Sequence, residues 1–200
     1  MLRVAGVATL IVENFENPLD KKPIISACLL HDMGNIVKFN SEWNEKNYPH
    51  IFNQYTVQYW ENVKKEFIEK YGDKEYLVTY KILKEIGIPN KIFDLIMSME
   101  FINIIKAPKI KKFETKICLY SDARVSPREV TSLSKRLAEV KERFIKNKGI
   151  SIKQYELLTK AAFKIEKQIF AHSKIKPEDI TEEKIKPLIK KLRSFEIESH

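Results

Sequence analysis

The sequence predicts an all-α protein, and two observations support that prediction. Only five of its 200 residues are glycine, whereas lysine, glutamate, isoleucine and leucine, all compatible with helices, are frequent. Apolar side chains recur three or four residues apart through most of the chain, which is the spacing of one buried face of a helix. We therefore expect helices packed on helices, and no segment is confidently assigned to a strand.

The first two helices are expected on either side of a proline break. Residues 2–15 carry an amphipathic stripe that Asn17-Pro18 interrupts. The second helix includes residues 24–33, because Pro23 suits a first helical turn and Gly34 suits the left-handed position that follows a helix end. The polar stretch after this glycine contains several aromatic residues and is expected to form either a loop or a loop that includes a short helix.

Three further helices are expected in the middle of the chain, at residues 52–71, 76–86 and 90–99. The first has an aromatic stripe that includes Trp60 and Phe67, which is more typical of a core face than of a base-stacking surface. Gly72 and Gly87 are expected to end the first two of these helices, and Pro89-Asn90 is expected to open the third.

Four helices are expected in the rest of the chain, at residues 113–125, from Ser126 to Gly149, at residues 152–169, and from Asp179 or Thr181 to Leu192. Ser126-Pro127 is a strong helix start, because serine caps a helix and proline suits its first turn. Ser151 and Gln154 form the capping-box pattern in front of the third of these helices. Pro187 is expected to kink or interrupt the last one.

The end of the second expected helix carries the side chains most suited to chemistry. Residues 24–33 are nearly all apolar or small, yet the run includes His31-Asp32. A helix that is apolar on every side belongs in the centre of a domain. An imidazole and a carboxylate are costly to bury there unless they are paired or bind a metal. The two residues are therefore either a satisfied core histidine beside an acidic helix end, or metal ligands.

The segment Leu29-Leu30-His31-Asp32-Met33-Gly34-Asn35 resembles the signature of the HD-domain superfamily of metal-dependent phosphohydrolases. Three more segments are similar to motifs of that family and occur in the family's order: Arg3-Val4-Ala5, residues 80–89 and residues 118–125. The resemblance implies a helical HD-like domain that hydrolyses phosphate esters with the help of a bound metal.

The resemblance also implies a division of the chain. It covers residues 1–126, where we expect the HD-like domain, and leaves residues 127–200 as a C-terminal helical extension. The apolar stripes of this extension must be buried somewhere. They either pack on the HD-like domain or form an oligomer interface, such as that of a homodimer.

The ligands that the resemblance implies are His31, Asp32 and Asp122. The family's first ligand is a histidine that would fall one residue before Met1. Either the recorded start lies downstream of the true one, or the protein is a degenerate member that binds metal weakly or not at all. One metal is expected rather than two, because the family's further histidines are replaced here by Glu75, Met99 and Glu100.

Imidazole and carboxylate ligands suit one divalent ion among Mn, Fe, Co, Ni, Zn and Mg, and the sequence does not choose between them. Such an ion would activate a bound water and polarise the phosphorus centre. Arg3, Lys38 and Arg124 are the cations nearest in sequence to the expected ligands. They are expected to act with Asp32 in catalysis by stabilising charge on phosphate oxygens, and the alternative is that they are solvated surface charges.

The leading interpretation is a metal-dependent phosphohydrolase that acts on a nucleotide or another small phosphorylated metabolite. The alternative is a catalytically degenerate HD-like module that binds a nucleotide or a partner protein.

The formal net charge of +9 leaves several partners open. A basic balance suits nucleic acid, an anionic membrane face or a phosphorylated substrate, but it also results from a lysine-rich composition. The lysines are spread along the chain and no nucleic-acid-binding motif is found, so nucleic acid is not an expected partner.

The sequence favours a cytoplasmic protein without a membrane span. No apolar stretch reaches about eighteen residues, and the first residues lack the pattern of a signal peptide. Cys28 and Cys118 both lie in apolar helical contexts and are expected to be buried thiols.

Overall fold

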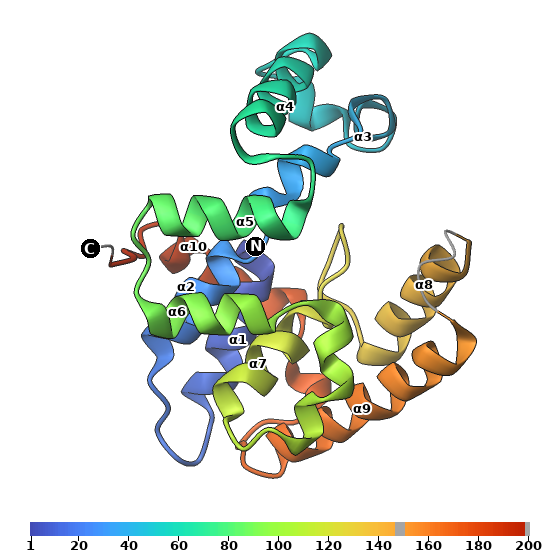
Figure 1. Ribbon diagram of the computed structural model, residues 1–200. Coiled ribbons are helices and arrows are strands. Elements are labelled where there is room, and N and C mark those ends of the chain that lie inside the picture. Colours follow the sequence, from blue (N-terminus) through green and yellow to red (C-terminus); the bar gives the residue numbers. More distant parts are fainter. Residues whose placement is uncertain (147–150, 199–200) are drawn as a thin grey trace. The chain divides into compact units, whose positions relative to one another are not determined.

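The all-α prediction is confirmed by the computed structural model, which describes residues 1–146 and 151–198 (Figure 1). Ten α-helices and several short 3-10 helices form the described part of the chain, and the β-type contacts within it are two isolated bridges. Most of the expected helix positions are confirmed. The stop expected at Gly149 falls outside the described residues.

The chain divides into two compact units. One combines Met1–Leu30 with Pro89–Glu198, and the other is formed by His31–Ile88. The boundary expected at residue 126 falls inside the first unit, because the helices that follow it pack on those that precede it.

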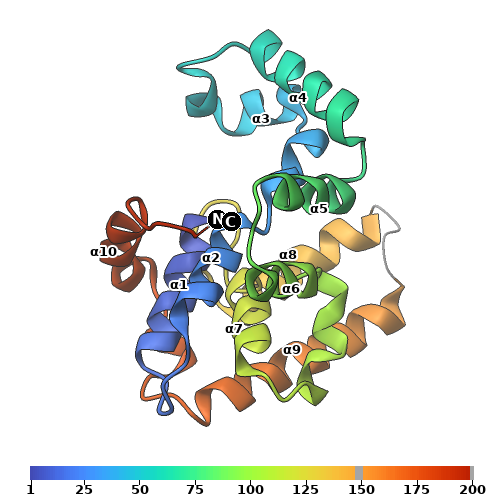
Figure 2. The ribbon, with the colours of Figure 1, turned by 60° about the vertical axis from the view of Figure 1, so that its left-hand side comes forward.

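The first unit contains α1 (Leu2–Glu13), α2 (Lys21–Leu30), α6 (Asn90–Ser98), η3 (Phe101–Ile105), η4 (Ala107–Lys109), α7 (Phe113–Asp122), α8 (Leu133–Lys146), α9 (Ile152–Phe170), η5 (Pro177–Asp179) and α10 (Glu182–Leu192). Helix α1 packs against α2, α7 and α10 (Figure 2). Helix α9 packs against α7 on one side and α8 on another. The core of this unit therefore lies around α1 and α7.

Helix α1 is buried on nearly every side because its sequence is almost entirely apolar or small. Eight of its twelve residues are buried, from Val4 to Val12. Gly6 faces α10, and a Cβ atom at this glycine would lie 3.4 Å from side-chain atoms of Ile185 and Ile189. Small residues in α1 thus allow α10 to approach closely.

The helix expected to begin at Ser126 begins instead at Leu133. The Ser126 hydroxyl does accept the backbone N–H of Glu129 at 3.1 Å, as in a helix cap. The chain then turns back on itself, with Val125 and Val130 forming an isolated antiparallel bridge. The carboxylate of Glu182, far away in sequence, accepts the N–H of Val130 at 2.9 Å, which draws the loop away from a helical path.

The second unit contains η1 (Met33–Lys38), α3 (Ser41–Asn47), η2 (Pro49–Phe52), α4 (Val57–Tyr71) and α5 (Glu75–Glu85). Its small core is formed by Val37, Val78 and Ile82, and Phe67 of α4 packs on it. The helix expected from residue 52 starts at Val57, because the Thr56 hydroxyl caps it. None of the side chains of α4 is fully buried, so its aromatic stripe covers the core rather than forming it.

Gly34 does not adopt the left-handed conformation that the sequence suggested. The described glycines with positive φ are Gly72 and Gly87, which end α4 and α5 as expected. Gly34 lies within η1 and donates its N–H to the Thr79 hydroxyl at 3.0 Å. A Cβ atom here would lie 2.5 Å from that hydroxyl oxygen and closer still to the backbone oxygen of Glu75. Gly34 is therefore required for close contact between η1 and α5.

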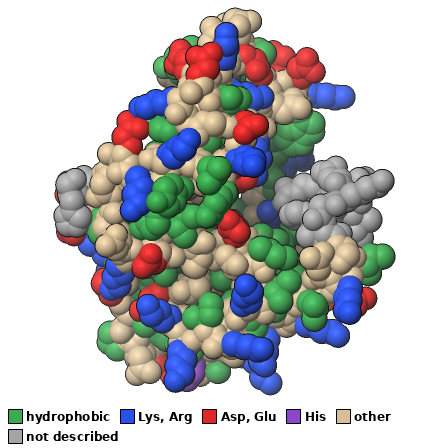
Figure 3. Space-filling view, viewed as in Figure 1, with side chains coloured by type: hydrophobic (Ala, Val, Ile, Leu, Met, Phe, Trp, Pro, Cys, Tyr) green, Lys and Arg blue, Asp and Glu red, His purple; other side chains and the backbone are tan. Residues whose placement is uncertain are grey.

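Positive charge is scattered, not concentrated in one patch, on the face of the molecule seen in Figure 3. Lysine and arginine side chains are scattered across the face shown in Figure 3, in keeping with their spread along the sequence. Among the described residues, no helix combines the length and the apolar character needed to cross a bilayer.

Replacing Gly34 with alanine should destabilise the protein by about 2 kcal/mol, because backbone atoms of α5 would have to move. Urea denaturation followed by circular dichroism measures this change. Gly6→Ala is the matched control, since its new Cβ atom meets ordinary van der Waals contacts in α1, and we expect a change within about 1 kcal/mol. Equal stabilities for the two variants would contradict the steric role of Gly34.

Candidate functional site

His31 and Asp32 directly follow α2, in the turn that leads into η1. Helix α2 is apolar, and its residues from Pro23 to Cys28 are buried, so the pair extends from a fixed element. The His31 side chain is only 6% exposed, whereas that of Asp32 is 41% exposed. His31 Nε2 lies 3.5 Å from Asp32 Oδ2. A buried imidazole thus stands beside a carboxylate that solvent can reach.

Lys38 ends η1 and forms an ion pair with Glu75 at the start of α5. At the other end of η1, the backbone N–H of Asn35 donates to the backbone oxygen of Asp32 at 3.0 Å and closes the turn that contains His31 and Asp32. The His31-Asp32 turn, η1 and the first turn of α5 therefore form one continuous piece of the second unit.

Asp122 is the last residue of α7, in the first unit. The buried thiol of Cys28, in the last turn of α2, has a raised pKa, first because it hydrogen bonds with Cys118 of α7 and then because it is buried. The Asp122 carboxylate raises this pKa further, and the amino group of Met1 lowers it. The chain start, the last turn of α2 and the end of α7 are therefore close enough to interact electrostatically.

The two buried thiols should not react in the folded protein, because the thiolate is the reactive form and burial disfavours it. With Ellman's reagent at pH 8, we expect the native chain to release no thionitrobenzoate rapidly. In guanidinium chloride we expect two thiols per chain to react. A Ser194→Cys variant, with its new thiol at an exposed position, should react at once and serves as the control. Rapid modification of the native protein would contradict the close packing of α2 on α7.

The structure places the expected metal ligands in both units: His31 and Asp32 in the second, and Asp122 in the first. Within the part of the chain that the structure describes, no three histidine, cysteine, aspartate or glutamate side chains form a group that could hold a metal ion. A metal site formed by these three residues therefore stays a prediction.

Arg3, one of the cations expected to contact phosphate, lies on α1 and pairs with α10. Its Nε atom donates to Glu182 Oε1 at 2.8 Å, and both side chains are partly exposed. An ion pair that solvent reaches contributes little to stability, so Arg3 can leave Glu182 for another anionic group at a small cost in free energy.

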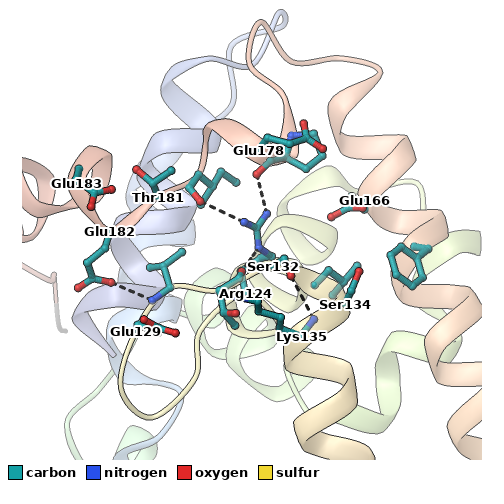
Figure 4. Close-up of a pocket in the computed structure, with 16 residues that line it drawn as sticks. Arg124, Glu129, Ser132, Ser134, Lys135, Glu166, Glu178, Thr181, Glu182 and Glu183 are labelled. Carbon is teal, nitrogen blue, oxygen red and sulfur yellow. Dashed lines mark hydrogen bonds between the residues drawn. The ribbon is translucent and has the colours of Figure 1, made fainter.

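Arg124 is buried, and its guanidinium group binds backbone and hydroxyl oxygens of the fold (Figure 4). Nε donates to the backbone oxygen of Thr131 at 2.6 Å, and Nη2 donates to that of Ile180 at 3.2 Å. Nη1 donates to the Tyr120 hydroxyl at 2.6 Å and to the backbone oxygen of Pro177 at 3.1 Å. These contacts give Arg124 a structural role, and its expected contact with phosphate stays a prediction.

The Tyr120 hydroxyl continues this network. It accepts from Arg124 and donates to Glu166 Oε2 of α9 at 2.7 Å. Burial raises the pKa of Tyr120, the nearby Glu166 carboxylate raises it further, and Arg124 acts in the opposite direction. The hydroxyl therefore stays protonated and holds the Glu166 carboxylate in one position.

A pocket of about 460 Å³ opens beside Arg124 (Figure 4). Its lining comes from three segments of the first unit: residues 124–135, α9, and residues 177–183. The pocket has no recognisable pattern in the sequence, because its residues come from segments that are far apart in the chain. The glutamates at positions 178, 182 and 183 were the available signal, but a short acidic run by itself indicates only a helix start.

Arg124→Lys should destabilise the protein by about 3 kcal/mol, because lysine cannot reach the four oxygen atoms that the guanidinium binds. Thermal and urea denaturation measure the loss. Arg193→Lys makes the same change at an exposed position and should leave stability within about 0.5 kcal/mol of wild type. A similar small change in both variants would show that the buried network is not important for stability.

Comparison of the chain with protein-family models, with curated proteins and with solved structures gives no match. The function is therefore argued from the residues and their surroundings.

Proposed function

We propose that this protein is a metal-dependent phosphohydrolase that acts in the cytoplasm on a nucleotide or another small phosphate ester. The observation that carries the proposal is the His31-Asp32 pair, which follows the buried helix α2 within a segment resembling the HD-domain signature. A buried imidazole next to a solvent-accessible carboxylate is an arrangement suited to metal binding.

The packing of the first unit supports the proposal. Helices α1, α2 and α7 pack against one another, and three of the four HD-like segments lie on these helices or directly after them, whereas residues 80–89 include the end of α5. Cys28, three residues before His31, is acted on by both Asp122 and the amino group of Met1. The chain start, where the family's first histidine would precede Met1, is thus near the helix that leads to His31.

The donor set is chemically suitable for a divalent ion. His31 would supply an imidazole nitrogen, and Asp32 and Asp122 would supply carboxylate oxygens. A bound ion would lower the pKa of a water molecule and withdraw charge from the phosphate ester. The low exposure of His31 restricts its ring to few orientations, so little conformational freedom would be lost on binding.

Arg3 and Lys38 are suited to binding the phosphate group itself. Arg3 pairs with Glu182 and Lys38 pairs with Glu75, and each ion pair is partly exposed. Exposed pairs of this kind are weak, so a phosphate oxygen can replace the carboxylate at small cost. After this exchange, Arg3 or Lys38 would contact the phosphate group, although both are paired with glutamates in the protein without substrate.

The proposal is tested by measuring metal content and phosphate-ester hydrolysis with each candidate metal. The probes are p-nitrophenyl phosphate and a panel of nucleoside monophosphates. Asp32→Asn and Asp122→Asn should each lower metal-dependent turnover by about a hundredfold or more, because both remove a ligand. Asp73→Asn, at an exposed position after α4, is the control and should keep full activity.

A second version of the chain, extended by Met-His in front of Met1, tests the first ligand. Metal binding and turnover that appear only in the extended chain would support the mechanism and assign the missing ligand to that histidine. If neither version binds metal or hydrolyses phosphate esters, the proposal that the protein is an enzyme is contradicted. Thermal stabilisation by a nucleotide in that case would favour the HD-like binding module.

A further inference from the structure

The pocket beside Arg124 has the size and the mixed lining of a small-molecule site. Its volume of about 460 Å³ lies within the range of roughly 300 to 1,000 Å³ that is usual for ligand pockets. Phe163, Val130 and Ile180 contribute apolar surface, and the hydroxyl groups of Ser132 and Ser134 contribute polar surface. Such a lining suits a ligand with an apolar body and a few polar ends.

The charge of the pocket is opposite to that of the whole protein. Five glutamates line it, at positions 129, 166, 178, 182 and 183, against two cations, Arg124 and Lys135, in a chain whose net charge is +9. The four hydrogen bonds of the Arg124 guanidinium go to oxygens of Tyr120, Thr131, Pro177 and Ile180 rather than to these carboxylates. Carboxylates therefore outnumber cations in the lining, and one of them, Glu182, is paired with Arg3.

Glu166 is the carboxylate best prepared to receive a ligand. The Tyr120 hydroxyl holds one of its oxygens, Oε2, at 2.7 Å, and this hydroxyl is itself fixed by Arg124. Among the described residues no cation forms an ion pair with Glu166 or with Glu178, which enters the pocket from η5. Figure 4 shows both labelled side chains beside the Arg124 guanidinium.

Phe163 adds a surface for the body of a cationic ligand. It precedes Glu166 by three residues on α9, so the two side chains lie on one face of that helix, and the ring is 40% exposed. An aromatic face next to a carboxylate favours ammonium groups, because the ring attracts the cation and covers its methylene chain.

Among the described residues, no three histidine, cysteine, aspartate or glutamate side chains form a group that could hold a metal ion. The carboxylates of the pocket come from separate segments, with Glu166 on α9 and Glu178 on η5. Carboxylates from separate segments around a partly apolar space suit a cation whose charges are separated by methylene groups.

We propose that this pocket binds a small aliphatic amine with two or more ammonium groups, one of them on Glu166 and another on Glu178, with the methylene chain lying along Phe163. None of the expected metal ligands lines the pocket, although its lining includes Arg124 and also Glu182, which pairs with Arg3.

Isothermal titration calorimetry of the full chain with cadaverine tests this proposal. We expect one cadaverine per chain, with a dissociation constant of about a millimolar or lower. Pentanediol, which has hydroxyl groups in place of the ammonium groups, should give no binding. Glu166→Gln and Glu178→Gln should each weaken cadaverine binding about tenfold, because a charge-assisted hydrogen bond becomes a neutral one.

Glu156→Gln is the matched control, since it removes the same charge from an exposed position of α9 outside the pocket. It should leave cadaverine affinity unchanged. Glutamine at position 166 can still accept from Tyr120, and thermal melts verify that each variant is folded. The proposal is overturned if cadaverine does not bind, if pentanediol binds equally well, if Mg²⁺ displaces cadaverine at equal concentration, or if both pocket variants bind like wild type.

Discussion

The burial of α1 is the constraint on which the rest of the first unit depends. Because this helix is apolar on nearly every side, it is stable only when other helices surround it, and α2, α7 and α10 do so. Two of these neighbours lead to residues of the proposed metal site, since His31 directly follows α2 and Asp122 ends α7. The hydrophobic effect thus holds α1, α2 and α7 together in the first unit.

Arg124 imposes a second constraint of a different kind. A buried guanidinium group is tolerated only when oxygen atoms satisfy its donors, and here those oxygens come from α7, the loop before α8, and residues 177–180. The same contacts fix Tyr120 and, through it, Glu166. One satisfied buried charge therefore shapes the walls of the pocket and keeps a carboxylate oriented within it.

The two proposed sites differ in the sign of the charged side chains that would bind their ligands. Arg3 and Lys38, the cations of the proposed hydrolytic function, form ion pairs with Glu182 and Glu75. Around the pocket, the glutamates outnumber the cations, and its arginine is committed to the fold. Glu182 connects Arg3 of α1 with the loop beside the pocket, because it accepts from Arg3 through one oxygen and from the Val130 N–H through the other.

The sequence by itself determined the helices and the position of His31, Asp32 and Asp122 at helix ends, because helix faces, caps and glycine stops depend on residues within a few positions. The capping box at Ser151 and the ends at Gly72 and Gly87 are examples. The tertiary structure decided what depends on distant residues. Glu182 diverts the loop after Ser126, α5 requires a glycine at position 34, and the pocket joins three segments that only packing brings together. Contacts of this kind leave no local pattern, since each residue's partner lies at least 40 positions away.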